Sequence, residues 1–277
     1  MSYPSLWHKT DFTTKIAASY FQRYNHLLKW KNYKENVLEV GCADGSITRD
    51  IIYPHIKDHT AKFLAVDKSE EMIEFAKQEE MIEFAKQDNR NLKIDYQVMD
   101  AMDPVQVERK KGQFDHIFSL LVAHWIPDNR KFVNGFRKML KPNGQIFMTI
   151  MVDTPMQQTF YKHASTGSWS KYVPNENIFG EYTDNPAKYF RNLVTDIGFK
   201  VELCESEKRS EVIEEFPDFL KVILSFYKYL NRIPPHLQEA YFQDHLRSCY
   251  EQGTYLGGKD NLDMPYETMI CVASKAA

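Results

Sequence analysis

The chain has 277 residues and a net charge of −3, with 43% hydrophobic and 26% charged residues. These values are ordinary for a soluble globular protein with a full core, and they give no electrostatic reason to expect nucleic acid as a partner. The sequence shows no run of about 18 apolar residues and no leader segment. Its four cysteines form no CxxC pair. We therefore expect a cytoplasmic protein without a membrane span, a metal site or a disulfide framework.

Hydrophobic spacing predicts that strands and helices alternate along the first half of the chain. A helix over residues 11–30 comes first, because apolar side chains recur there at helical spacing: Ile16, Tyr20, Phe21, Tyr24, Leu27 and Leu28. Strands are predicted over residues 36–41, 62–67, 92–99, 114–121 and 145–152. Between them we expect helices over residues 46–55, from 69 onward and over 129–140, and a turn over 141–144. This alternation predicts a parallel sheet with crossover connections.

The second half of the chain is less regular. Helices are predicted over residues 188–197, 214–230 and 236–250, and strands over 199–206 and 266–274. The seven strands together predict an α/β fold with one mostly parallel sheet. No flexible linker is visible, so we expect a single domain over residues 1–277.

One segment is repeated without change. The sequence EEMIEFAKQ stands at residues 70–78 and again at 79–87. Nine residues at about 100° each turn a helix by about 900°, so the two copies would bury opposite faces. Both copies cannot pack on one face of the sheet unless the helix is broken or bulged. We expect one copy to be an inserted duplication that lengthens the helix or the next loop and leaves the sheet intact.

The run VLEVGCADGS at residues 37–46 is the strongest functional signal. An apolar strand containing Glu39 ends in a turn with Gly41 and Gly45 and then enters a helix. Glycines let the backbone approach a ligand closely, and open parallel sheets bind ligands at the carboxyl ends of their strands. The pattern is not GxGxxG, which disfavours an NAD-dependent enzyme.

Three further strand ends carry polar groups suited to an adenosine. Asp67 ends the second predicted strand and can accept hydrogen bonds from a ribose diol. Asp100 and Ala101 follow the third strand, where a carboxylate and a backbone N–H can contact an adenine edge. Ser119 stands near the end of the fourth strand, in the run SLLVAHW. The four strand ends together predict a site for an adenosyl group with an amino-acid tail.

This arrangement resembles the class I methyltransferases, which have a Rossmann-like sheet. The resemblance implies S-adenosylmethionine as the cofactor, no metal, and a cofactor-binding core over residues 31–152. The N-terminal helix would precede this core, and lid helices with closing strands would follow over residues 153–277. The cofactor contacts implied by the resemblance are Glu39, Gly41, Ala43, Asp44, Gly45, Asp67, Lys68, Asp100, Ala101 and Ser119.

A closer resemblance is carried by LWHKTDF, GCADGSIT, FDHIFSLLVAHWIPD and EEFPDFLKVILSFYKYLNRIPPHL. Over most of the chain these runs resemble the insect juvenile hormone acid methyltransferases, which methylate the carboxylate of farnesoic acid or juvenile hormone acid. The resemblance implies a small hydrophobic carboxylic acid as substrate. A homodimer is a separate possibility that the sequence leaves open. The resemblance also implies that Trp125 donates its indole N–H to that carboxylate. Thr14 stands where the family carries a Gln as a second donor.

Methylation of a carboxylate needs no general base, because a carboxyl group with a pKa of about 4 is already ionised. Catalysis would come from alignment of the reacting atoms, with Trp125 holding one carboxylate oxygen. His124 would act as a base only if the acceptor were a phenol or an amine. Helical spacing predicts either a lid over the acceptor or ordinary core packing for Phe216, Phe219, Leu220, Ile223 and Tyr227, and Trp169 and Phe226 are further wall candidates.

Other functions stay open at this point. Methylation of nitrogen in nucleic acid is disfavoured, because SLLV stands where such enzymes usually carry an Asp/Asn-Pro-Pro-aromatic run. A different small-molecule acceptor is a second alternative. A diverged paralogue that binds S-adenosylmethionine or a terpenoid without turnover is favoured by Thr14 and by the duplication.

Overall fold

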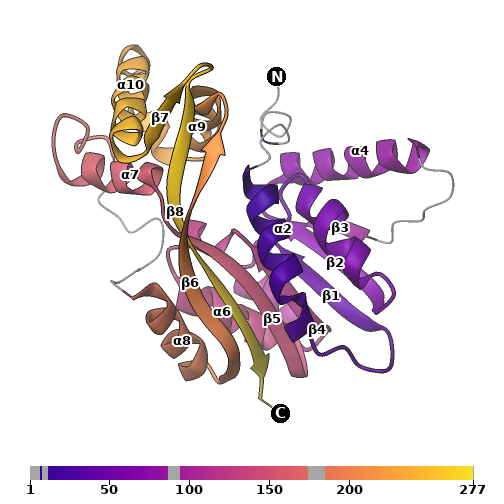
Figure 1. The fold of residues 1–277 in the computed structure, drawn as a ribbon. Helices are drawn as coiled ribbons and strands as arrows, with labels where there is room; N and C mark the ends of the chain where they lie inside the picture. Colours follow the sequence, from indigo (N-terminus) through magenta and orange to yellow (C-terminus); the bar gives the residue numbers. More distant parts are fainter. Residues whose placement is uncertain (1–6, 8–11, 87–93, 174–184, 277) are drawn as a thin grey trace.

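The computed structural model describes residue 7 and residues 12–86, 94–173 and 185–276. Its centre is one sheet in the order β3-β2-β1-β4-β5-β8-β6, with β7 paired to β8 (Figure 1). The strands are β1 (Glu35–Val40), β2 (Thr60–Asp67), β3 (Ile94–Val98), β4 (Phe114–Leu120), β5 (Leu140–Asp153), β6 (Phe199–Ile213), β7 (Thr254–Gly257) and β8 (Asn261–Lys275). Strands β1 to β5 are parallel, and β8 is antiparallel to β5 and β6. The predicted Rossmann-like, mostly parallel α/β fold with seven main strands is confirmed, and β7 is an additional short strand.

Helices cover both faces of this sheet. The α-helices are α2 (Phe12–Tyr24), α3 (Tyr53–Ile56), α4 (Glu70–Lys86), α5 (Pro104–Arg109), α6 (Asn129–Met139), α7 (Pro155–Ser165), α8 (Pro186–Asp196), α9 (Phe216–Ser225) and α10 (Pro235–Gln252). Side chains of α2, α3 and α4 belong to one buried apolar cluster, and those of α5, α6 and α8 belong to another. Adjacent residues such as Val37 and Leu38 point to opposite clusters, because side chains alternate along a strand. None of the described helices is long and apolar enough to cross a membrane.

Several boundaries differ from the sequence-based predictions. The first helix ends at Tyr24 and continues only as a 3-10 turn to Leu27, and its predicted start at residue 11 lies outside the described residues. The predicted helix over residues 46–55 contains a π-turn at Thr48–Ile52 before α3. The predicted turn over residues 141–144 is a bulge within β5, where Asn143 has a φ of 61° and two pairings to β4 are five residues apart on β5.

The largest difference is a long antiparallel ribbon of β6 and β8. Phe199 pairs with Lys275 at one end and Ile213 pairs with Leu262 at the other. The ribbon extends beyond the sheet to the region of α7, α9 and α10 (Figure 1). Strand β6 continues to Ile213, beyond its predicted end at residue 206. The predicted helix over residues 214–230 is shorter, because α9 ends at Ser225 and only a 3-10 segment follows over Lys228–Arg232.

The repeated segment forms one continuous helix, α4, which projects beyond β3 at the edge of the sheet (Figure 1). Met72 and Ile73 of the first copy are buried, whereas Met81, which repeats Met72, is 71% exposed. Strands β2 and β3 pair in continuous register from Phe63 with Ile94 onward. The prediction that the extra copy lengthens the helix and leaves the sheet intact is therefore confirmed.

Deletion of residues 79–87 is expected to change the melting temperature by less than about 3 °C, because Met81 adds little burial and about 1 kcal/mol shifts a domain of this size by about 2–4 °C. Circular dichroism melts of the two proteins measure the difference. Two variants at equivalent repeat positions serve as a control. Met72→Ala should cost about 2–5 kcal/mol and Met81→Ala less than about 0.5 kcal/mol. A melting temperature lowered by about 10 °C or more on deletion would show that the second copy is structural.

Candidate active site

A cavity of about 680 Å³ opens at the carboxyl ends of β1, β2 and β4. This is the edge where the four predicted strand ends meet, and ligands of open parallel sheets bind at this edge. The structure brings most of the predicted site residues together around it. Those that line the cavity are Thr14, Gly41, Ala43, Asp44, Asp67, Lys68, Asp100, Ala101 and Trp125. No group of three or more His, Cys, Asp or Glu side chains in the described ranges is arranged to hold a metal ion.

The turn after β1 depends on Gly41. Its φ of 83° is unfavourable for other residues, and a Cβ at this position would lie 2.3 Å from Cγ2 of Val122. The Gly41 N–H donates to the carbonyl oxygen of Val66 at 2.7 Å, which holds the turn against β2. The backbone at Gly41 can therefore pass closely between β2 and Val122. The residues that follow, including Ala43 and Asp44, line the cavity.

Gly45 was predicted as a cofactor contact, but it does not line the cavity. A Cβ here would lie 2.8 Å from the Tyr96 hydroxyl oxygen and 3.1 Å from Cβ of Ala76. Gly45 therefore allows the turn to pack closely against β3 and α4, so the structure needs a glycine here for packing.

Asp67 joins the ends of β1 and β2. Its Oδ2 accepts a hydrogen bond from the Ala43 N–H at 3.1 Å, and its Oδ1 accepts one from the Ser69 N–H at 2.9 Å. Burial raises the pKa of this carboxyl above its usual value, against the opposing effect of these backbone bonds. A carboxylate has about four acceptor sites, so Asp67 can bind a ribose diol while it holds the turn.

Asp100 and Ala101 follow β3 at the same edge. Oδ1 of Asp100 accepts a hydrogen bond from the Met102 N–H at 2.8 Å, and its own N–H donates to Oε1 of Gln106 at 3.1 Å. These bonds fix the bend after β3 and place both residues on the cavity wall.

Glu39 and Ser119 lie within the strands, below the cavity, and do not line it. Both are almost fully buried, at 1% and 0% exposure. Burial and the charges of Asp67 and Asp44 raise the pKa of Glu39 to about 8. Each residue stands one position before the end of its strand. Their contact with the cofactor stays a prediction.

The burial of Glu39 predicts a pH dependence of stability. Its carboxyl holds a proton in the folded protein up to about pH 8, whereas in the unfolded chain it loses the proton near 4.5. The folded state therefore binds more protons in this window, and stability falls as pH rises through it by up to about 1.4 kcal/mol per pH unit. Glu39→Gln should abolish this part of the fall, measured by urea unfolding of the ligand-free protein at about pH 5.5, 6.5 and 7.5.

Glu108→Gln is the matched control, because Glu108 is exposed and its pKa is lowered by Lys111. This substitution should leave the slope between about pH 5.5 and 7.5 unchanged. Parallel curves for the wild type and Glu39→Gln would contradict the prediction.

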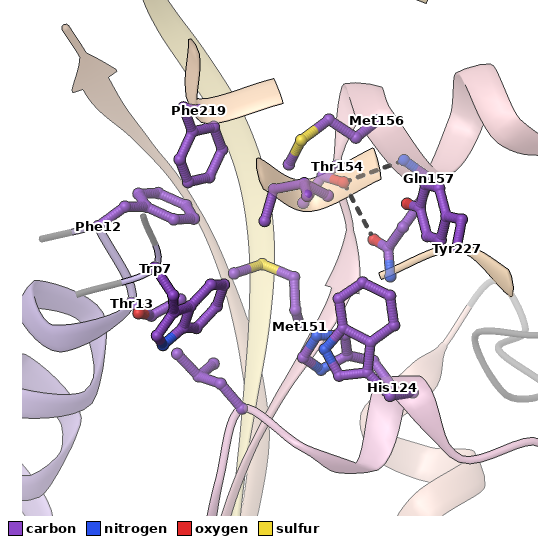
Figure 2. Close-up of a pocket in the computed structure, with 13 residues that line it drawn as sticks. Trp7, Phe12, Thr13, His124, Met151, Thr154, Met156, Gln157, Phe219 and Tyr227 are labelled. Carbon is purple, nitrogen blue, oxygen red and sulfur yellow. Dashed lines mark hydrogen bonds between the residues drawn. The ribbon is translucent and has the colours of Figure 1, made fainter. Parts of the chain in front are cut away.

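A second, smaller pocket of about 50 Å³ adjoins the large cavity (Figure 2). The two share Trp7, Thr13, Leu121, Trp125 and Tyr227. The remaining lining residues, most of them apolar, are Phe12, His124, Met151, Thr154, Met156, Gln157, Phe219 and Ile223. Trp125 therefore lies at the junction of the two spaces.

Trp125 and His124 belong to a short 3-10 turn over Ala123–Trp125, directly after β4. The Trp125 ring lies 5.7 Å from those of Phe226 and Tyr227, centroid to centroid, so the segment after α9 packs on it. His124 lines only the small pocket, and burial lowers its pKa to about 3. Its imidazole is therefore neutral at physiological pH and a weak base.

The predicted lid residues divide into two groups. Phe219, Ile223 and Tyr227 line the small pocket, and Phe226 and Tyr227 line the large cavity. Trp169, Phe216 and Leu220 are buried in the core and line neither space.

Sequence reasoning missed the wall that α7 supplies, including Thr154, Met156 and Gln157. A cue was present, because Thr154 followed by Pro155 is typical of a helix start. Thr154 does cap α7, and its hydroxyl accepts a hydrogen bond from the Gln157 N–H at 3.2 Å.

Comparison with known proteins identifies the family. Residues 31–216 match a family model described as a methyltransferase domain. The juvenile hormone acid O-methyltransferase of Bombyx mori is 24% identical over 89% of this chain and 85% of its own length. The protein of the same name in Drosophila melanogaster is 23% identical over 99% of this chain and 93% of its own length.

Two solved structures show the same fold. A Bacillus halodurans protein described as a methyltransferase superposes with a TM-score of 0.58 at 15% identity, over 94% of this chain and all of that one. The N-methyltransferase 2 of Haemonchus contortus, solved with S-adenosylhomocysteine, gives a TM-score of 0.51 at 16% identity, over all of this chain and 61% of that one. The chain therefore belongs to the methyltransferase domain family and is an S-adenosylmethionine-dependent enzyme of the class I fold.

Proposed function

We propose that this enzyme methylates the carboxylate of a small hydrophobic acid, such as farnesoic acid or juvenile hormone acid. The observation that carries this proposal is the position of Trp125 between the cofactor cavity and an apolar pocket without an effective base. The names of the Bombyx mori and Drosophila melanogaster relatives support the same class of substrate.

The residues of the large cavity suit S-adenosylmethionine, which supplies a methyl group on a sulfonium sulfur. The open backbone after Gly41 would face the methionine part, and Asp67 would accept hydrogen bonds from the ribose. Asp100 and Ala101 would contact the adenine. The carboxylates that line the large cavity would therefore bind the cofactor, and none of them also lines the small pocket.

The titratable groups of the small pocket favour an acceptor that is already ionised. Burial lowers the pKa of His124 to about 3, so its imidazole is a poor acceptor for the proton of a phenol or an ammonium group. Burial also raises the pKa of Tyr227, which stays protonated. A carboxylate needs no base at neutral pH, since its pKa is about 4.

Trp125 would orient the acceptor through its indole N–H. A neutral donor aligns one carboxylate oxygen and leaves the other free to attack, and alignment of reacting atoms is a large source of rate acceleration. A cation in the same place would stabilise the carboxylate more than the transition state and slow the reaction.

The test is a methyl-transfer assay with S-adenosylmethionine and a panel of acceptors, with products identified by mass spectrometry. Farnesoic acid and other hydrophobic acids should give methyl esters, and phenols and amines of similar size should give no product. Binding of cofactor and acid without an ester would instead support a non-catalytic paralogue. Turnover of phenols but not acids would overturn the proposal.

A further inference from the structure

The small pocket contains a buried amide with an unused donor. Gln157 of α7 is only 5% exposed and lines the pocket, and its Nε2 has no hydrogen-bond partner within the described part of the chain. Buried side-chain N–H groups without a partner are unfavourable and therefore uncommon in native structures. A ligand oxygen in the pocket would supply the missing acceptor.

Thr154 fixes the direction in which this amide points. The Thr154 hydroxyl accepts a hydrogen bond from the Gln157 backbone N–H at 3.2 Å and donates its own proton to Gln157 Oε1 at 3.2 Å (Figure 2). In this arrangement the single hydroxyl proton of Thr154 is used by Oε1. The arrangement therefore turns Oε1 toward Thr154 and Nε2 away from it.

The size of the pocket limits what Nε2 can contact. A volume of about 50 Å³ holds on the order of four water-sized groups, which suits a carboxylate, and the chain of a longer acid would continue into the adjoining large cavity. The pocket shares Trp125 with the cofactor cavity, so a carboxylate placed here lies beside the cofactor site. His124 lines the same pocket as a neutral imidazole and adds no charge.

We propose that Gln157 Nε2 donates a hydrogen bond to one oxygen of the acceptor carboxylate and is the second donor beside Trp125. Thr14 lines the large cavity but not the small pocket, whereas Gln157 of α7 lies on the wall of the small pocket itself. Gln157 is a positioning and specificity residue that selects an acid over a neutral acceptor. This inference rests on the proposed function, because it assumes a carboxylate acceptor.

Gln157→Leu tests the inference, because leucine keeps the approximate size and removes the donor. Calorimetry with farnesoic acid, in the presence of S-adenosylhomocysteine, should show a dissociation constant raised about 10- to 100-fold. The dissociation constant for farnesol should change less than about threefold, since an alcohol gains less from this donor. Selectivity for acid over alcohol should therefore fall at least about tenfold. S-adenosylmethionine affinity should be unchanged.

Gln158→Leu is the matched control. Gln158 is the next residue, is exposed and bonds to Asp153 at 2.7 Å, outside both pockets. Its acid binding should equal that of the wild type. Gln157→Glu is a second variant that retains a polar side chain, and its charge should weaken farnesoic acid binding more than leucine does.

The outcomes separate this inference from the proposed function. If the wild type binds farnesoic acid and forms no ester, the proposed function fails, while weaker binding by Gln157→Leu still supports the inference. If the wild type forms the ester and Gln157→Leu keeps the same affinity and the same acid-to-alcohol selectivity, the inference is wrong and the proposed function stands. A wild type that binds no farnesoic acid would overturn both.

Discussion

Gly41→Ala is expected to destabilise the protein by about 2–5 kcal/mol and to weaken S-adenosylmethionine binding at least about 100-fold. The new Cβ would lie 2.3 Å from Cγ2 and 2.9 Å from Cγ1 of Val122, and the φ of 83° would strain any residue with a Cβ. Backbone strain of this kind costs about 1–2 kcal/mol, and overpacking adds about 1–3 kcal/mol or more. Urea unfolding measures the stability and calorimetry the affinity.

Two further variants separate strain from overpacking. Gly112 has a φ of 61°, but a Cβ added there would meet no atom within 4 Å, so Gly112→Ala should show the strain alone. Val122→Ala combined with Gly41→Ala should recover the overpacking part, with a coupling of about 1–3 kcal/mol in the double-mutant cycle. Equal losses in Gly41→Ala and Gly112→Ala would show that Val122 can move aside, contrary to this prediction.

The cofactor half of the site could be predicted from sequence because its determinants are local. Apolar strands that end in Gly41, Asp67 and Asp100 are visible as short runs, and parallel strands bring their carboxyl ends to one edge. The effect of the nine-residue repeat could also be predicted locally, because helical geometry alone places its two copies on opposite faces of one helix. Glu39 and Ser119, one position before the ends of β1 and β4, are buried and do not line the large cavity, which the strand pattern alone could not show.

The small pocket could not be predicted in the same way, because segments that are far apart in the sequence line it. Gln157 of α7 and Trp125, which follows β4, line the same pocket only because β5 pairs with β4 and leads into α7. Helical spacing identified the apolar side of α9, but Phe219 lines the pocket and Leu220 the core, although both are buried. The charged residues of β6 obscured a strand that continues to Ile213, since one side of that ribbon faces solvent.

Trp125→Phe is expected to lower kcat/KM for farnesoic acid by about 100-fold and to change S-adenosylmethionine affinity by less than about threefold. Phenylalanine preserves ring packing against Phe226 and Tyr227 but removes the indole N–H. A hydrogen bond to a charged group contributes about 1.5–3 kcal/mol, and misplacement of the acceptor lowers the rate further. Steady-state kinetics with calorimetry for the cofactor measures both effects.

Trp30→Phe is the matched control for this substitution. Trp30 stacks on His59 at 5.0 Å and packs on His116 at 4.1 Å, centroid to centroid, and lines neither pocket. Its kcat/KM should stay within about threefold of the wild type. An equal loss in both tryptophan variants would indicate a general effect on the fold.

The double variant Trp125→Phe, Gln157→Leu shows whether the two side chains hold the same carboxylate. Residues that act as a unit have non-additive effects, because once one donor is lost the acceptor is already misplaced. We therefore expect the double variant to lose less activity than the product of the two single losses. A fully multiplicative loss would place the two donors on independent groups of the substrate. The carboxylate would then be held by Trp125 alone.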